Sequence, residues 1–108
     1  MNTYKLEPYS PPDGVIYQYY SSGPVYRIQR FEKGYKVGLQ EAFYENGCPK
    51  TIEPYKDGLR DGLTLLYWPN GCLKRSVSFS LGVRHGEDCF WDEKGVLTFK
   101  AVYKHGHI

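Results

Sequence analysis

Short runs of apolar and aromatic residues alternate along the chain with clusters of turn residues. The segment GLQEAFYE, residues 38–45, reads as a strand, and CPKTIEPY, residues 48–55, reads as its return strand. Between them, Asn46-Gly47 is typical of a type I′ turn, in which both central residues have a positive φ. The segment KDGLRD, residues 56–61, then turns the chain toward the next run. The pattern therefore predicts a β-hairpin followed by a second turn.

This hairpin pattern repeats with a period of 24 residues. The 12 glycines fall into three series with that spacing, at 14/38/62/86, 23/47/71/95 and 34/58/82/106. Two aromatic series share the period: Tyr19, Phe43, Tyr67 and Trp91, and Phe31, Tyr55, Phe79 and Tyr103. A repeat of this length indicates an array in which each unit packs on its neighbours. We expect four units, at residues 13–37, 38–61, 62–85 and 86–108, after a leader, residues 1–12, that caps the first edge.

The predicted fold is all-β, a single-layer antiparallel up-and-down meander of four 24-residue hairpins with about eight strands. The first glycine of a unit is expected to pair across the hairpin with the last aromatic residue, as Gly38 with Tyr55 and Gly62 with Phe79. A ring that lies over a residue without a side chain would explain both positions.

Residues paired across a hairpin share a face of the sheet. With a turn at Asn46-Gly47, one face collects Tyr20, Val25, Phe31, Tyr44, Tyr55, Leu66, Trp68, Leu73, Val77, Phe79, Phe90, Leu97 and Tyr103. The other collects Tyr17, Tyr19, Tyr26, Ile28, Leu39, Phe43, Ile52, Leu63, Leu65, Tyr67 and Trp91. We expect twist to bury the first set against itself and to leave the second partly open, as a contact surface or merely as a lining of the sheet. A shift of one residue at a bulge would exchange the faces.

The composition agrees with one small folded domain and indicates the cellular compartment in which it is expected. Hydrophobic residues make up 41% of the chain and charged residues 24%, so it can bury a core. Neither a signal-like segment nor a long apolar stretch is visible. The three cysteines, Cys48, Cys72 and Cys89, are an odd number, which favours a reduced cytoplasmic protein. Cys48 and Cys72 are expected two strands apart, roughly 9.6 Å, too far for a disulfide.

Candidate chemistry is sparse. The histidines His85, His105 and His107 read as surface turn residues, because no Cys or carboxylate lies in a matching register to complete a metal site. Serines have no histidine in a matching position, and the acids of the second unit have no cleft on a flat sheet. We therefore expect a protein that is not an enzyme and has no cofactor or metal.

Charge differs between units. The first and third units are net positive and the second and fourth net negative, within an overall charge of +2. No continuous basic face is expected from this alternation, so a nucleic-acid partner is not predicted. It suits a protein partner with complementary patches, although a solvated surface without a role would tolerate it equally.

Units such as GLQEAFYENGCPKTIEPYKDGLRD, with the pattern YENG…YKDG…DG, resemble MORN repeats, and specifically the bacterial variant. The resemblance covers residues 13–108. The first unit departs from it with Ser21-Ser22-Gly23-Pro24, and the fourth carries Asp92 where the others have Tyr20, Tyr44 and Trp68. The resemblance implies a hairpin-repeat fold, in a family whose members serve as scaffolds, membrane-proximal modules and predicted antitoxins.

These observations together predict a non-enzymatic module that binds a protein, and the resemblance implies an antitoxin or immunity protein that neutralises a toxin by direct binding. The expected partner-binding residues are Tyr17, Tyr19, Tyr26, Phe43, Tyr67 and Trp91 as apolar anchors, with Arg27, Lys74 and Arg75 as charged contributors. The alternative is a membrane-peripheral module that binds anionic lipid, or a scaffold. Self-association through the last strand, residues 97–103, is a further possibility, because that edge has no visible cap.

Overall fold

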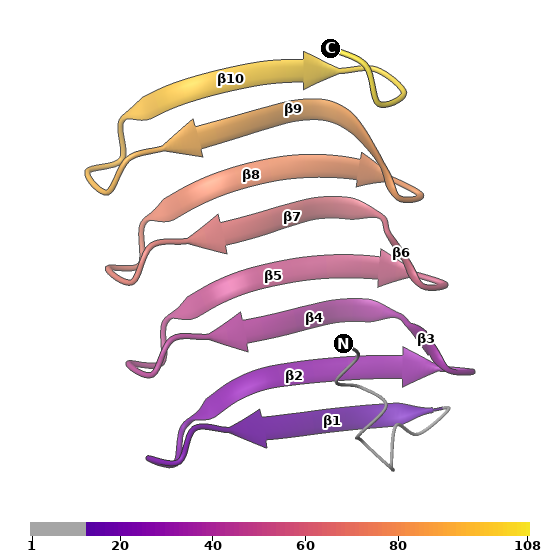
Figure 1. Cartoon of the computed structure of the whole chain (residues 1–108), viewed down its shortest axis with the longest axis vertical. Helices are drawn as coiled ribbons and strands as arrows, with labels where there is room; N and C mark the ends of the chain where they lie inside the picture. Colours follow the sequence, from indigo (N-terminus) through magenta and orange to yellow (C-terminus); the bar gives the residue numbers. More distant parts are fainter. Residues whose placement is uncertain (1–12) are drawn as a thin grey trace, which may run out of the picture.

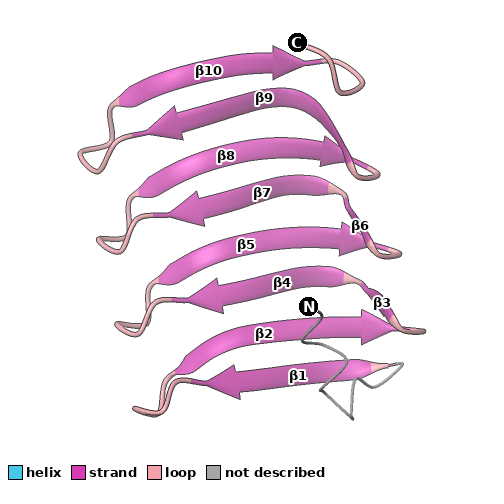
Figure 2. Cartoon of the chain, viewed as in Figure 1, coloured by secondary structure: helices cyan, strands magenta, loops and turns pink. Residues whose placement is uncertain are grey.

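The computed structural model describes residues 13–108, which form one antiparallel sheet without a helix (Figures 1 and 2). The strands are β1 (Gly14–Tyr19), β2 (Val25–Glu32), β3 (Tyr35–Lys36), β4 (Gly38–Phe43), β5 (Pro49–Lys56), β6 (Leu59–Arg60), β7 (Gly62–Tyr67), β8 (Leu73–Ser80), β9 (Val83–Trp91) and β10 (Leu97–Tyr103). The predicted all-β, single-layer meander is confirmed. The predicted edge-capping leader, residues 1–12, lies outside the described residues.

Eight strands follow one another across the sheet in the order β1-β2-β4-β5-β7-β8-β9-β10. The two-residue strands β3 and β6 precede β4 and β7 and are separated from them by one residue each, Val37 and Asp61. There the backbone N–H of Val37 donates to the carbonyl of Arg30 at 3.1 Å, and that of Asp61 to the carbonyl of Pro54 at 3.0 Å. The extra residue is a bulge that separates β3 from β4 and β6 from β7.

The turns at the Asn-Gly end differ from the prediction. The Gly47 N–H donates to the Tyr44 carbonyl at 2.9 Å, and the Tyr44 N–H to the Cys48 carbonyl at 2.8 Å. Gly47 has a positive φ of 92°, but Asn46 does not have a positive φ. A type I′ turn at Asn46-Gly47 is therefore wrong: the loop has one left-handed residue, a glycine, as in hairpins whose type I turn ends in a bulge. The Asn46 side chain adds to the loop by accepting from the Cys48 N–H and donating to the Pro69 carbonyl of the next hairpin.

Type I′ turns lie at the opposite edge of the sheet. Both central residues have a positive φ at Lys33-Gly34, Asp57-Gly58, Leu81-Gly82 and His105-Gly106. Each turn closes a two-residue loop, for example between the paired residues Ser80 and Val83. Leucine is costly in this conformation, because its Cβ approaches the following carbonyl and it has no polar group to compensate.

The expected pairing of glycines with rings is confirmed, but the reason is different. Gly38 pairs with Tyr55 and Gly62 with Phe79. A Cβ added at Gly38 would meet nothing within 4 Å, and one at Gly62 would meet Pro54 at 3.1 Å, not the ring. The φ values of 69° and 112° require glycine at both positions, since L side chains rarely adopt them.

Side chains link each hairpin to the next. At the Asn-Gly edge, an aromatic donor reaches a carbonyl of the following hairpin: Tyr20 to Phe43 and Tyr44 to Tyr67 at 2.7 Å, and Trp68 to Trp91 at 3.1 Å. At the other edge, glycine N–H groups donate to a carbonyl of the preceding unit: Gly58 to Lys36 at 2.9 Å, Gly82 to Arg60 at 2.6 Å and Gly106 to Arg84 at 2.8 Å. The fourth aromatic position holds Asp92, which instead accepts from the N–H groups of Lys94 and Val96 within its own turn. Asp92 therefore ends the series of aromatic donors.

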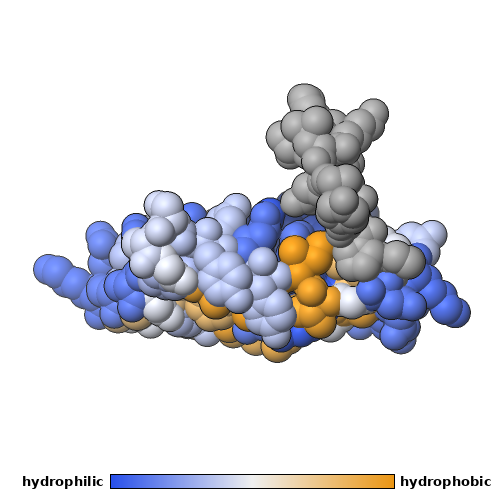
Figure 3. All heavy atoms as spheres, turned by 90° about the horizontal axis from the view of Figure 1, so that it is seen from below, coloured by the Kyte–Doolittle hydropathy of each residue, from blue (hydrophilic) through white to orange (hydrophobic). Residues whose placement is uncertain are grey.

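The buried core is small. Among the described residues only Val77, Cys89 and Ala101 are buried apolar side chains. Gln40, Thr64 and Asp88, which share the 24-residue period, are buried polar ones. The molecule is a slab with extents of 41 × 34 × 25 Å. Seen from the β1 end, hydrophobic residues gather along its middle and hydrophilic ones at the turn edges (Figure 3). With so little burial, the links between hairpins must contribute much of the stability.

Removing one aromatic donor should weaken the sheet measurably. Tyr44→Phe deletes the hydroxyl bonded to the Tyr67 carbonyl and should lower the free energy of unfolding by about 1 kcal/mol in urea titration. Tyr17→Phe is the matched control, because Tyr17 is 53% exposed, and it should change stability by less than about 0.5 kcal/mol. Equal effects of the two substitutions would contradict the role of the aromatic donor.

The leucine in a type I′ turn predicts a stabilising substitution. Leu81→Asn should raise the free energy of unfolding by about 0.5–1 kcal/mol, because Asn tolerates the left-handed conformation at φ 46°. Leu59→Asn is the control, since Leu59 packs on Gly82 outside the left-handed region, and it should give no gain. A loss of stability in Leu81→Asn, measured by thermal or urea unfolding, would show that the turn is not strained.

Candidate functional site

The strand register sorts the side chains into two faces that differ in exposure. Along one face, Gln40 pairs with Glu53, Thr64 with Val77 and Val77 with Asp88. We call this the closed face, because most of the deeply buried side chains lie on it, with Asp88 only 2% exposed. The opposite, open face carries Val15, Leu39 and Leu63, each nearly half-exposed at 46–48%. One face is thus more buried than the other, as expected. The expected sets were wrong for Val25, Leu73 and Leu97, which lie on the open face because they pair with Tyr19, Tyr67 and Trp91.

The open face carries exposed apolar residues over its first strands, with the Arg30–Glu41 ion pair among them. Val15, Leu39 and Leu63 recur at the 24-residue period on β1, β4 and β7. Tyr17 and Tyr19 of β1 lie beside them and are 53% and 60% exposed. A shallow hollow of about 270 Å³ opens next to these rings and is lined by Pro24, Val25, Ile28, Phe43 and Gly47. Such a surface can accept an apolar side chain from outside.

Five of the predicted partner-binding residues lie on the open face. They are Tyr17, Tyr19, Phe43, Tyr67 and Trp91, of which the last three are half-buried. Alternation along the strands places them there: Gln18, Ala42, Leu66 and Phe90, each next to one of them, point to the closed face. The structure thus brings the predicted apolar anchors together, and their role in binding stays a prediction.

The other four predicted residues do not join them. Arg27 and Arg75 project from the closed face, since Arg27 pairs with Ala42 and Arg75 with Leu66. Tyr26 and Lys74 are the extra residues of bulges at the start of β2 and β8. A partner flat against the open rings therefore cannot contact Arg27 or Arg75. The bulges shifted the alternation that the sequence pattern assumed.

At these bulges the side chains stack on rings of the preceding turn. Tyr26 packs on Tyr20 with centroids 5.4 Å apart, and the Lys74 ammonium lies 4.6 Å from the Trp68 ring centre. Lys50, at the same position of the second unit, lies 5.7 Å from the ring of Tyr44. Tyr44 follows Phe43 of the open face, so alternation turns its ring to the closed face.

Cations stacked on rings cover the closed face, and sequence reasoning missed them. The strand residues involved are Arg27 over Tyr26 at 5.4 Å, Lys36 over Tyr55 at 5.2 Å, Arg60 over Phe79 at 5.5 Å, Arg75 over Phe90 at 4.6 Å and Arg84 over Tyr103 at 4.6 Å. Arg60 also lies 5.9 Å from Tyr55, and so sits between two rings. A signal was present, because Lys36, Arg60 and Arg84 recur at the 24-residue period. Such contacts are attractive where the cation is partly desolvated.

Two carboxylates pair with three of these cations, Glu53 with Arg60 and Asp88 with Arg75 and Arg84. Asp88 accepts two hydrogen bonds from Arg75, Nε to Oδ1 at 3.0 Å and Nη2 to Oδ2 at 2.8 Å. This bonding to Asp88 raises the pKa of Arg75 above its ordinary value. Glu53 accepts two hydrogen bonds from Arg60 at one oxygen, Oε2, from Nε at 3.3 Å and from Nη2 at 3.0 Å. Burial, and secondarily the Glu53 charge, raises the pKa of Tyr55 above its ordinary value. Because the fold favours the neutral phenol, Tyr55 contributes stability that is lost as the pH rises through this raised pKa.

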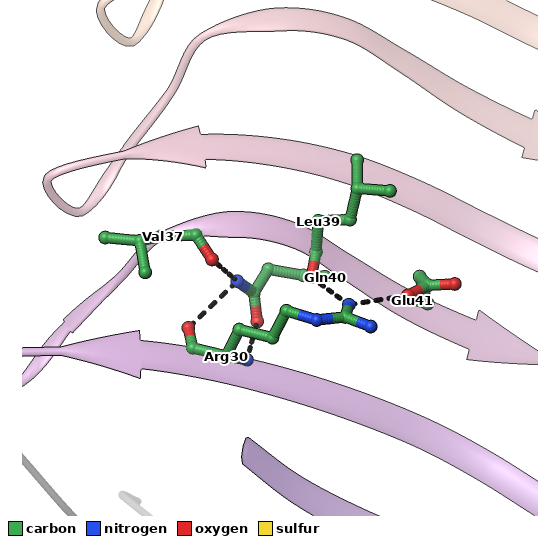
Figure 4. A network of polar contacts seen from close by, with 5 residues as sticks. All are labelled: Arg30, Val37, Leu39, Gln40 and Glu41. Atoms are coloured by element: carbon green, nitrogen blue, oxygen red, sulfur yellow. Dashed lines mark hydrogen bonds and ion pairs between the residues drawn. The ribbon is translucent and has the colours of Figure 1, made fainter. Parts of the chain in front are cut away.

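A polar network fixes the backbone beneath Leu39 (Figure 4). The buried Gln40 amide accepts from the Arg30 N–H at 3.0 Å and donates to the carbonyls of Arg30 and Val37 at 3.1 Å. The Arg30 guanidinium donates to the Leu39 carbonyl at 2.7 Å and to Glu41 at 2.6 Å. The network replaces strand pairing next to the bulge, and it holds Leu39 outward on the open face.

Histidine and cysteine positions point to structural roles. Asp13 and Asp61 accept from the N–H groups of Lys33 and Leu81 in the type I′ turns, and His85 Nδ1 takes the same place for His105 at 3.4 Å. Within residues 13–108 no three His, Cys, Asp or Glu side chains come together as metal ligands. The three cysteines are free; Cys89 is buried, and Cys48 and Cys72 are half-buried. No helix capable of crossing a membrane occurs in this part of the chain.

Comparison with known proteins gives one family match. A family model described as MORN repeat variant matches residues 36–57, the segment that holds β4, β5 and the turn between them. No curated protein matches the chain. The match supports a MORN-repeat protein, and hence a repeat-based binding module.

The buried ion pair predicts a large and specific loss. Asp88→Asn should lower the free energy of unfolding by about 2–3 kcal/mol, because it leaves the half-buried Arg75 guanidinium without its counter-charge. Glu87→Gln is the adjacent control: Glu87 faces the opposite side, is exposed and pairs with Lys100, so it should cost less than about 0.5 kcal/mol. Denaturant titration of both variants measures the difference, and similar losses would refute the special role of Asp88.

Proposed function

We propose that the chain is a non-enzymatic repeat module that binds another protein through its open face. The observation that carries this proposal is the exposure of Val15, Leu39 and Leu63 on a single-layer sheet in which no described residue covers them. Exposed apolar residues rimmed by polar ones are typical of a surface that contacts a partner, and here the Arg30–Glu41 ion pair lies among them.

The open face also has features of a binding hot spot. Tyr17 and Tyr19 pair with Ile28 and Val25, two of the residues that line the hollow, so an apolar side chain of a partner would meet rings and aliphatic groups there. Aromatic residues dominate binding energy at protein interfaces. The sheet beneath is tied from hairpin to hairpin by hydrogen bonds, which reduces the ordering required on binding.

The finer proposal is that the partner is a toxin, which the chain neutralises in the cytoplasm as an antitoxin or immunity protein. Support for it comes from the resemblance of the units to the bacterial variant of the MORN repeat, together with cysteines that suit a reducing compartment. A membrane-peripheral or scaffolding role is the alternative.

Substitutions on the open face test the binding proposal. Tyr17→Thr combined with Leu63→Thr keeps strand propensity and removes two exposed apolar groups. Affinity capture with the wild type should recover a defined partner, identified by mass spectrometry. The double variant should bind it about 100-fold more weakly, because each anchor contributes more than 1 kcal/mol.

The matched control is Leu81→Asn combined with Val96→Thr, which removes two equally exposed apolar groups from turns. It should bind the partner as the wild type does. Equal binding by the open-face variant would refute the open face as the site. Strong pelleting of the wild type with anionic vesicles, without a protein partner, would favour the membrane alternative. For the finer proposal, the captured partner should arrest growth when expressed alone, and the wild-type chain but not the open-face variant should relieve that arrest.

A further inference from the structure

Seven of the cations in residues 13–108 stack on rings: Arg27, Lys36, Lys50, Arg60, Lys74, Arg75 and Arg84. Register and ring contacts place all of them on the closed face, where Glu53 and Asp88 are the opposing strand carboxylates. The other described residues hold six Lys or Arg and nine Asp or Glu. The small net charge of the chain thus conceals a positive closed face and a negative remainder, and the expectation that the alternating charges form no basic face is wrong.

We propose that the closed face is a second docking surface, which binds an acidic segment of a protein partner. The charges are half-exposed rather than sealed: the side chains of Arg60 and Arg84 are each 44% exposed and that of Arg75 is 30% exposed. Stacking holds each cation in position before a partner arrives, which lowers the ordering cost of binding. The electrostatic match also raises the rate of encounter.

The chemistry of the face favours carboxylates. Glu53 and Asp88 show that arginines here already bind carboxylate groups, with Arg60 and Arg75 each contributing two N–H donors. Lys36, Lys50 and Lys74 form no ion pair among the described residues, and they remain available to an incoming acid. The face therefore combines pre-paired arginines with free ammonium groups.

The spacing of the cations indicates the backbone conformation of the acidic segment. Lys36, Arg60 and Arg84 lie two strands apart from one another, so they repeat at roughly 9.6 Å across the sheet. In a polyproline II segment, side chains three residues apart share a side and are about 9.3 Å apart. In a β-strand, same-side residues lie about 6.6 Å or 13 Å apart, which does not fit. An extended segment with a carboxylate at every third residue matches the column.

Other anions fit less well. A nucleic acid carries a phosphate at every nucleotide, so some phosphates would face the carboxylate of Glu53 at the margin of the column. Membrane contact would need rings that project beside the cations, whereas here the rings of Tyr55 and Phe79 lie beneath them. Both become outcomes of the test.

The wild-type chain can be tested without any substitution. The probe is a synthetic peptide of five Glu-Pro-Pro triplets, with five Lys-Pro-Pro triplets as the control, titrated into ¹⁵N-labelled protein at low salt. The Nε–Hε resonances of Arg60 and Arg84 should shift in a saturable manner, while that of Arg30, which faces the other side, should not. No shift, or an equal shift of Arg30, would overturn the proposal.

Matched charge variants test the assignment to this face. Lys36→Gln, Lys50→Gln and Lys74→Gln together should weaken binding of the labelled Glu-Pro-Pro peptide about tenfold in fluorescence anisotropy. Lys33→Gln, Lys56→Gln and Lys94→Gln remove the same charge from exposed positions that are not stacked on rings, and should weaken it by no more than about twofold. Glutamine retains part of the stem over each ring, and circular dichroism checks the fold.

Equal losses in the two triple variants would show that only net charge matters and would overturn the proposal. Tighter binding of single-stranded oligothymidylate than of the peptide would overturn it in favour of nucleic acid, and displacement of the peptide by phosphatidylglycerol vesicles would do so in favour of lipid. Tyr17 and Leu63 are unchanged in both triple variants, so this surface and open-face binding can fail separately.

Discussion

Hydrogen bonds from one hairpin to the backbone of the next are the interaction on which the sheet depends. A single layer cannot bury a large core, and only three apolar side chains are buried among residues 13–108. Aromatic donors such as Tyr44 link the hairpins at one edge, and glycine N–H groups such as that of Gly82 link them at the other. The 24-residue period follows from this requirement, because every unit must present the same donor and acceptor at the same place.

The two faces of the sheet differ in how their side chains are covered, since no second layer packs on either of them. On the closed face, long cationic side chains lie over rings and, with Asp88 and Glu53, cover the sheet as a second layer would. On the open face, Leu39 and Leu63 have no such cover. An external protein therefore has an apolar surface to bury on one side and an ordered positive surface to pair with on the other. These two sides suit different partner chemistries.

Much of the fold could be predicted from the sequence, because it depends on period and pairing. The glycine and aromatic series predicted the hairpins, and the pairs Gly38–Tyr55 and Gly62–Phe79 were predicted correctly. The turn type at Asn46-Gly47 was not, because this dipeptide fits more than one loop length, and here Tyr44 and Cys48 pair across a loop of three residues. The faces of Tyr26 and Lys74 were obscured by bulges, which change the alternation without a clear mark in the sequence. The column of Lys36, Arg60 and Arg84 carried the same period as the glycines and could have been recognised.

The central claim is that one face of this sheet is open to solvent while the other is closed by its own side chains. Hydroxyl-radical footprinting with mass spectrometry measures this difference directly at individual side chains. Tyr17, Tyr19 and Leu63 should be oxidised several-fold faster than Tyr55 and Phe79, after correction for the intrinsic reactivity of each residue type. Equal corrected rates on the two faces would contradict the account, because they would mean that the open rings are covered or that the cation stacks do not shield the closed face.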